Sequence, residues 1–118
     1  MPRILAIGIA TLDIVNLVSE YPAEDSEVRA LAQRTGRGGN ATNTLAVLSQ
    51  LGHRCSWGGV LAMDADAAPI IADLQAHAID LSYCRRLEHG KNPVSYILAS
   101  QATGSRSIVH YRDLPEYA

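Results

Sequence analysis

The residues best suited to chemistry lie in one stretch, Arg37-Gly38-Gly39-Asn40-Ala41-Thr42-Asn43. Two adjacent glycines run into two asparagines where an apolar helical pattern begins. Glycine lets a backbone approach a ligand closely, and the start of a helix offers unpaired N–H groups and a positive dipole end. Because an asparagine side chain both donates and accepts hydrogen bonds, it suits a hydroxyl group, which does the same. This stretch therefore predicts a polyhydroxylated small molecule bound at a helix start.

Alternating strands and helices must position that stretch. The apolar run 4–7, which ends at Gly8, is typical of a strand buried on both faces of a parallel sheet. Apolar residues at helical spacing predict one helix from about 41 to 51, stopped by Gly52, and a second helix that follows a cap at 64–66. Strands are expected at 55–61 and 81–87. Such alternation indicates right-handed βαβ units on a parallel sheet.

Two pairs of extended segments do not fit the alternation, so they predict a separate small sheet. The first pair comprises residues 12–18 and 27–34. The second pair, 94–99 and 106–111, reads as a hairpin closed by a loop over 100–105. Both faces of this sheet would carry apolar side chains and need cover. The bound ligand with the core would cover one face, and a partner subunit the other.

Composition narrows the classes of function. The chain has 118 residues, 47% of them hydrophobic, and a net charge of −2, which favours neither nucleic acid nor an anionic membrane as partner. No long apolar run or leader-like N-terminus is evident, so a cytoplasmic location is the default expectation. Cys55 and Cys84 stand alone and the four histidines lack ligand spacing, so we expect neither a disulfide nor a metal site.

Five motifs occur in order along the chain. They are Gly8 followed by Leu12-Asp13, Tyr21-Pro22-x-Glu24-Asp25-Ser26-Glu27, the stretch 37–43, Leu48-Ser49-x-Leu51-Gly52, and Gly104-Ser105-Arg106-x-Ile108-Val109. Together they resemble the ribokinase-like (PfkB) family of carbohydrate kinases, and within it the ketohexokinase branch. The resemblance spans nearly all of the chain. Leu45 departs from the small residue that the wider family prefers, which tells against ribokinase proper more than against the ketohexokinase branch.

The resemblance implies an α/β fold, the N-terminal part of a ribokinase-like parallel-sheet core with a separate small β-sheet lid. The core would take in about residues 1–10 and 41–91, and the lid about 11–40 and 92–112. It also implies phosphoryl transfer from ATP to a sugar hydroxyl, with Mg²⁺, and a homodimer in which two lids clasp each other. Ketohexose is the expected sugar, although other members of the family use ribose, 2-keto-3-deoxygluconate or nucleosides.

The resemblance also implies which residues bind the sugar. They are Asp13, Asp25, Gly38, Gly39, Asn40 and Asn43, with Arg106 near the sugar and the transferring phosphate. Each has a simpler interpretation. Asp13 would be a polar interruption in an edge strand, Asp25 a local turn residue, and Arg106 a solvated hairpin residue. Asn40 or Thr42 would be the helix cap. The adjacent glycines favour binding, since a cap does not require them.

The Gly-Ala-Gly-Asp motif, which supplies the family's catalytic base and anion hole, is absent from this sequence, as is the Asn-x-x-Glu associated with magnesium. We therefore expect no catalytic residue and no main ATP or Mg²⁺ ligand in this chain. The prediction is the sugar-binding half of a carbohydrate kinase, inactive alone and weak in binding fructose. The alternative is a stand-alone sugar-binding or dimerisation module.

Overall fold

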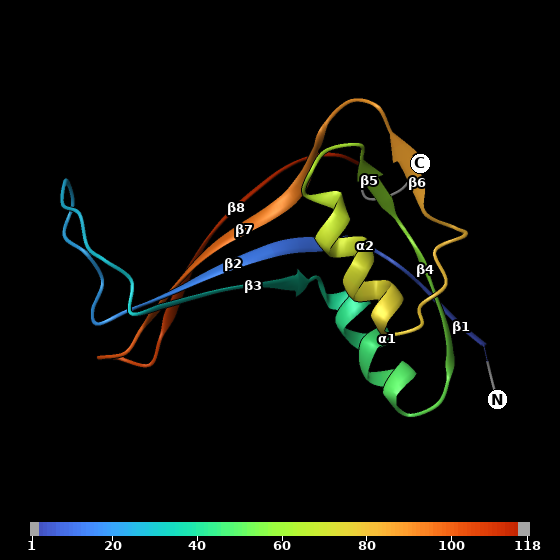
Figure 1. Cartoon of the computed structure of the whole chain (residues 1–118), viewed down its shortest axis with the longest axis horizontal. Coiled ribbons are helices and arrows are strands. Elements are labelled where there is room, and N and C mark those ends of the chain that lie inside the picture. The colour runs from blue at the N-terminus through green and yellow to red at the C-terminus, as the bar shows by residue number, and fades with distance from the viewer. Residues whose placement is uncertain (1–2, 116–118) are drawn as a thin grey trace.

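The computed structural model describes residues 3–115 and has an α/β core from which a second sheet projects as a long arm (Figure 1). In the core, β1 (Arg3–Ile7) pairs in parallel with β4 (Arg54–Gly58), and β5 (Val60–Ala62) pairs in parallel with β6 (Arg85–Leu87). Helices α1 (Asn40–Gln50) and α2 (Ala67–Ala76) connect these strands. The expected parallel core is confirmed.

The two helices cover one face of the core strands. Their apolar sides bury Leu45, Ile70 and Leu74 completely, next to the fully buried Trp57. Ile4 and Ala6 of β1 pack against the same cluster. The alternate residues of that strand, Leu5 and Ile7, point the other way and are 52% and 62% exposed. In the part of the chain that the structure describes, β1 pairs with β4 alone, so its other edge is open.

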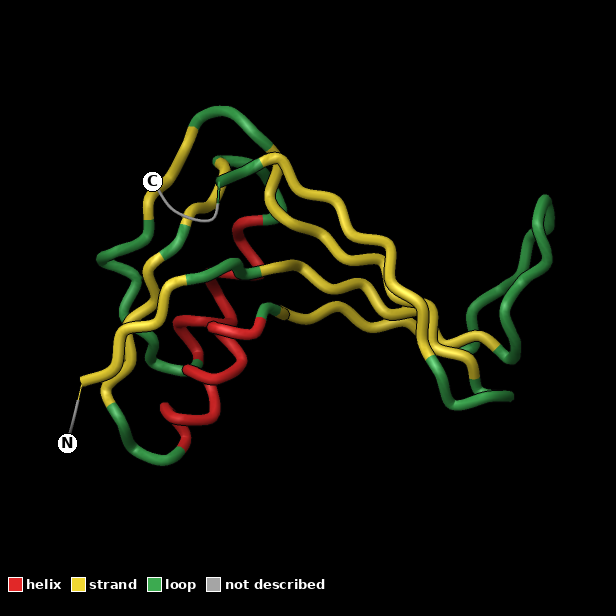
Figure 2. The backbone as a smooth tube through the Cα atoms, turned by 180° about the vertical axis from the view of Figure 1, so that it is seen from behind, coloured by secondary structure: helices red, strands yellow, loops and turns green. Residues whose placement is uncertain are grey.

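The arm is a four-stranded sheet with the strand order β3-β2-β7-β8 (Figure 2). Neighbouring pairs are antiparallel except β2 and β7, which run parallel with Leu12 opposite Val94. The expected hairpin is confirmed as β7 and β8. We call this sheet the lid. Its strands are β2 (Thr11–Val18), β3 (Ala32–Gly38), β7 (Lys91–Ser100) and β8 (Arg106–Asp113).

Three sequence-based boundaries are corrected. The extended segment expected at 27–34 is wrong, because residues 27–31 form no strand and β3 instead covers 32–38. Its pairing with β2 makes Arg37 and Gly38 strand residues, so the expected glycine loop shrinks to Gly39. The strand expected at 55–61 is broken at Gly59 into β4 and β5. Only the last three residues of the segment 81–87 form a strand, since Cys84 N donates to Leu81 O in a turn.

The helix caps also differ from expectation. Gly39 occupies the cap position of α1 and no side chain caps this helix. Neither Asn40 nor Thr42 is therefore the cap, and the Thr42 hydroxyl instead donates to Gly38 O at 2.8 Å. Asp66 occupies the cap position of α2, also without a side-chain cap bond. At the start of α2 the carboxylate of Asp64 instead accepts from Asp66 N at 3.0 Å.

The fully buried side chain of Asn92 joins the lid to the core, at the point where β7 begins. Its oxygen accepts from Ala62 N at 2.8 Å, and its amide nitrogen donates to Ala62 O at 3.0 Å and to the Asp64 carboxylate. Asn92 N donates to the same carboxylate at 3.1 Å. Burial opposes the charge of Asp64, but these bonds, the amide of Asp66 and the nearby Lys91 outweigh it and lower the Asp64 pKa. We call this group the lid junction.

The lid is apolar on both faces away from the core. On the face that turns away from Asp13, Tyr96, Val109 and Tyr111 are 54%, 71% and 60% exposed. Leu12 and Val94 on that face are buried, because they lie at the core end of the lid. Among the described residues no helix is long and apolar enough to cross a membrane.

Candidate functional site

A cavity of about 540 Å³ lies where the lid meets the start of α1. Its size falls in the range of sites for a small molecule. The apolar part of its wall comes from the segment after β1 and from lid residues such as Ile97 and Ile108. The polar groups at its surface come from both lid and core: Thr11, Asp13, Asn40, Asn43, Ser95 and Arg106.

Gly39 brings the start of α1 to the cavity. Its φ of +105° is the left-handed region that favours glycine, and a Cβ here would lie 2.2 Å from Ile9 O. The segment after β1 therefore crosses directly over the helix start, and the two together line the cavity. Because the first N–H groups of a helix have no intrahelical partner, this wall favours ligand oxygens or negative charge.

Asp13 projects from β2 into the cavity, and its neighbours fix the carboxylate. Thr11, two residues earlier on the same face of the strand, donates from Oγ1 to Asp13 Oδ1 at 2.7 Å. Gly38 on the adjacent strand makes room for it, because a Cβ there would lie 2.2 Å from Asp13 Oδ2. Gly38 itself does not line the cavity. Its contribution is space for the carboxylate.

The structure brings five of the seven candidate residues to this one cavity: Asp13, Gly39, Asn40, Asn43 and Arg106. Gly38 lies directly behind Asp13. Asp25 does not line the cavity. It is exposed, with a φ of +56°, and belongs to the loop 19–31 at the far end of the lid (cyan in Figure 1). A positive φ is commoner for aspartate than for most residues and agrees with a turn position.

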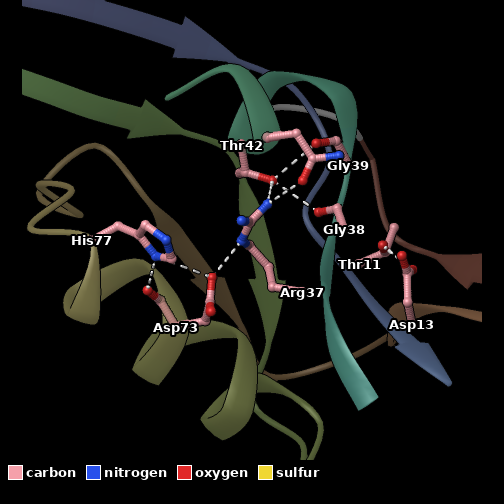
Figure 3. Close-up of polar contacts among 9 residues, drawn as sticks. Thr11, Asp13, Arg37, Gly38, Gly39, Thr42, Asp73 and His77 are labelled. Carbon is pink, nitrogen blue, oxygen red and sulfur yellow. Dashed lines mark hydrogen bonds and ion pairs between the residues drawn. The ribbon is translucent and has the colours of Figure 1, made fainter. Parts of the chain in front are cut away.

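Arg37, which the sequence reading did not treat as a site residue, is the centre of a hydrogen-bond network beneath the cavity (Figure 3). Its side chain is only 6% exposed, and Nε donates to Asp73 Oδ2 on α2 at 2.7 Å. Nη1 donates to Thr42 Oγ1 at 2.8 Å and to Asn43 Oδ1 at 2.7 Å. His77 Nδ1 lies 3.5 Å from the same Asp73 oxygen. The guanidinium therefore ties a lid strand to both helices.

Three further residues were missed. Thr11 had a signal, since it alternates with Asp13 on one face of a strand. Ser95 lies opposite Asp13 in the β2–β7 register, and its hydroxyl is 2.9 Å from His110 Nδ1; only the pairing of β2 with β7 reveals it. The buried Trp57 donates from Nε1 to Gly8 O at 3.0 Å and so fixes the segment after β1. No sequence pattern predicts that bond, because the two residues are 49 positions apart.

The site combines a carboxylate acceptor, two carboxamides, a helix start and a guanidinium. Such groups can bind several hydroxyls of one small molecule in defined directions. Within residues 3–115 no three acidic, histidine or cysteine side chains are grouped so that they could hold a metal ion. The chemistry of this wall is recognition by hydrogen bonds.

Comparison with known proteins agrees with this arrangement. The family model "pfkB family carbohydrate kinase" matches residues 1–117. Mouse (Mus musculus) ketohexokinase is 41% identical over 115 residues, which cover 97% of this chain and 39% of that protein. This chain thus spans about two fifths of that relative's length.

Solved structures give the same fold. A candidate ribokinase from Agrobacterium tumefaciens superposes with a TM-score of 0.86 at 25% identity, covering 94% of this chain and 36% of that one. The ribokinase of Arabidopsis thaliana, solved with ribose and ATP, gives 0.80 at 23% identity over 93% of this chain and 35% of its own. Because the family model matches residues 1–117, the chain belongs to the pfkB family of carbohydrate kinases.

Proposed function

We propose that this chain supplies the sugar-binding wall of an ATP-dependent carbohydrate kinase of the ketohexokinase type. The observation that carries the proposal is the single cavity that collects Asp13, Gly39, Asn40, Asn43 and Arg106 from the lid and the start of α1. The first four would hold a monosaccharide while a phosphoryl group passes from ATP to one of its hydroxyls.

Each polar group has a role that matches its chemistry. Asp13 Oδ2 accepts from sugar hydroxyls, since Oδ1 is already engaged by Thr11. The carboxamides of Asn40 and Asn43 bind neighbouring hydroxyls. Arg106 neutralises the charge that builds as the phosphoryl group moves, because a guanidinium is always protonated and suits phosphate oxygens. Asp25 would join this set only if the loop 19–31 folded over the cavity. The residues that hold ATP and Mg²⁺ would lie outside this chain.

A ketohexose is the proposed substrate, on the strength of the 41% identity with mouse ketohexokinase. We expect the chain alone to bind it weakly, in the millimolar range, because the cavity is open on one side. The test is a titration of ¹⁵N-labelled protein with fructose and with ribose. Amide shifts confined to residues such as Gly39 and Asn40 support the proposal. If neither sugar shifts any amide resonance, the proposal is contradicted. Micromolar affinity would contradict the expectation that the open cavity binds weakly.

Two aspartate variants sharpen the titration. Asp13→Asn keeps the size of the side chain but removes the charged acceptor, so the fructose-induced shifts should disappear or need roughly tenfold more sugar, which is about 1.4 kcal/mol. Asp113→Asn is the matched control, since Asp113 is exposed at the end of β8 and lines no part of the cavity. If fructose shifts the amides equally in both variants, Asp13 does not bind the sugar.

The exposed apolar residues of the lid favour a second proposal, association of two copies through this sheet. Tyr96, Val109 and Tyr111 are all more than half exposed and adjacent in the β7–β8 register. Large contiguous apolar patches mark interaction sites. A homodimer that buries these residues is compatible both with a kinase and with the alternative function, a dimerisation module without catalysis. Phosphorylation of fructose by a longer polypeptide that contains this segment would separate the kinase from that alternative.

A further inference from the structure

We propose that Arg37 is a positioning residue that holds the carboxamide of Asn43 so that its NH₂ group, rather than its oxygen, faces the cavity. The proposal rests on the proposed function for the identity of the ligand. The orientation itself rests on the geometry of this chain. Asn43 lines the cavity, and its Oδ1 accepts from Arg37 Nη1 at 2.7 Å.

The chemistry of the guanidinium decides which end of the carboxamide it meets. Arginine carries five N–H donors and no acceptor, so the NH₂ group of an asparagine would find no partner there. The carboxamide oxygen is therefore the atom that turns toward Arg37. The NH₂ group, on the other side of the same planar amide, is left for the cavity. Asn43 then acts on a ligand as a donor.

Arg37 can impose this orientation because it is itself immobilised. Its Nε donates to Asp73 Oδ2, and the same Nη1 that binds Asn43 also donates to Thr42 Oγ1. The Thr42 hydroxyl in turn donates to Gly38 O, in the glycine pair that shapes the cavity. With the side chain 6% exposed, the guanidinium has almost no contact with water. A lysine could not replace it, since one ammonium group cannot reproduce the planar fork.

With this orientation, Asp13 and Asn43 have complementary hydrogen-bonding roles toward a ligand. Asp13 offers only acceptors, and Asn43 offers donors. A ligand must then present a hydroxyl hydrogen to Asp13 and an oxygen to Asn43. Neighbouring hydroxyls of a monosaccharide meet both demands, because each hydroxyl both donates and accepts. The same reasoning predicts that the deoxy analogue lacking the oxygen that faces Asn43 binds less well.

The first experiment needs no ligand. NMR of the ¹⁵N-labelled chain should show two well-separated Asn43 side-chain NH₂ resonances and an Arg37 Nε–H that exchanges slowly. In Arg37→Met the two Asn43 resonances should move together and gain mobility, and in Arg37→Lys they should do so in part. Arg34→Met is the matched control, an exposed arginine on the same strand, and should leave them unchanged. Unchanged Asn43 resonances in folded Arg37→Met would overturn the proposal.

The second experiment replaces Asn43 itself. Asn43→Asp keeps an oxygen for Arg37 and puts a second oxygen where the NH₂ group was. If Asn43 is a donor, fructose-induced shifts at Gly39 and Asn40 should need at least tenfold more sugar. If binding is retained, Asn43 serves as an acceptor and the proposal fails.

The two proposals can fail separately. Sugar-induced shifts at Gly39 together with a mobile, unshifted Asn43 NH₂ group would leave the sugar site standing and overturn the role of Arg37. If no sugar shifts any cavity resonance, the proposed function fails. The ligand-free comparison of Arg37→Met with Arg34→Met then still decides whether Arg37 holds Asn43.

Discussion

At the scale of single residues, the site requires glycine at positions 38 and 39, where a side-chain Cβ would collide with neighbouring atoms. Gly38 contributes no group to the cavity, yet the Asp13 carboxylate occupies the space that a Cβ at residue 38 would need. Gly39 likewise lets two backbones cross. The two glycines therefore have different roles. Gly38 leaves space for the Asp13 carboxylate, and Gly39 lets the segment after β1 cross the start of α1.

A substitution at Gly38 tests this directly. Gly38→Ala places a Cβ 2.2 Å from Asp13 Oδ2, so the carboxylate must move and fructose binding should be lost. Unfolding in urea should show a loss of about 1–3 kcal/mol from the overpacked contact. Gly36→Ala is the control on the same strand, because the nearest atom to its Cβ would be Arg34 Nη1 at 3.9 Å. Normal sugar binding by Gly38→Ala would contradict this role.

At the scale of elements, one buried asparagine joins the start of β7 to the core strand β5. Asn92→Ala leaves the amide and carbonyl of the buried Ala62 without these partners, which should cost about 3 kcal/mol of unfolding free energy. Asn16→Ala is the matched control, since Asn16 on β2 only accepts from Gln33 at 2.8 Å near the surface. Urea unfolding of both variants measures the difference. Equal losses of unfolding free energy in the two variants would show that Asn92 does not stabilise this junction.

The lid junction also predicts a pH dependence. The folded pKa of Asp64 lies below its ordinary value of 3.8. A lowered pKa contributes stability that is complete above the ordinary value and is lost as the pH falls through the folded pKa. The stability advantage of the wild type over Asp64→Asn should therefore be constant near pH 6 and shrink below about pH 4. Urea unfolding from pH 6 to 3 checks this, and a constant difference over the whole range would contradict it.

The elements themselves were largely predictable from sequence, and their partners were not. The apolar run of β1 and the helical spacing of Leu45 and Leu48 indicated the parallel core. The start of β3 was misplaced by about five residues, because its pattern is polar and its limits are set by pairing with β2. The site residues Asp13 and Asn43 had motif signals. Ser95 lies opposite Asp13 only through the β2–β7 pairing, and the burial of Arg37 depends on Asp73, 36 residues away, so no local pattern could assign either role.

At the scale of the whole molecule, the exposed faces indicate what the chain needs around it. If two copies associate through the lid, the double substitution Tyr96→Ser with Val109→Lys should convert a dimer to a folded monomer. Sedimentation velocity measures the change. Leu51→Ser is the control, because Leu51 is 67% exposed at the end of α1, far from the lid. A wild-type chain that sediments as a monomer contradicts the association.

The parallel pairing of β2 with β7 has a consequence for synthesis. Leu12 finds its partner Val94 only after roughly eighty more residues have been made. At typical elongation rates of about 5–20 residues per second, the nascent β2 waits on the order of 4–16 s with its apolar face bare. During that interval on the ribosome β3 is the one neighbouring strand of β2 that has already been made. Slow codons between the two segments would lengthen this vulnerable period, and chaperone dependence should rise with them.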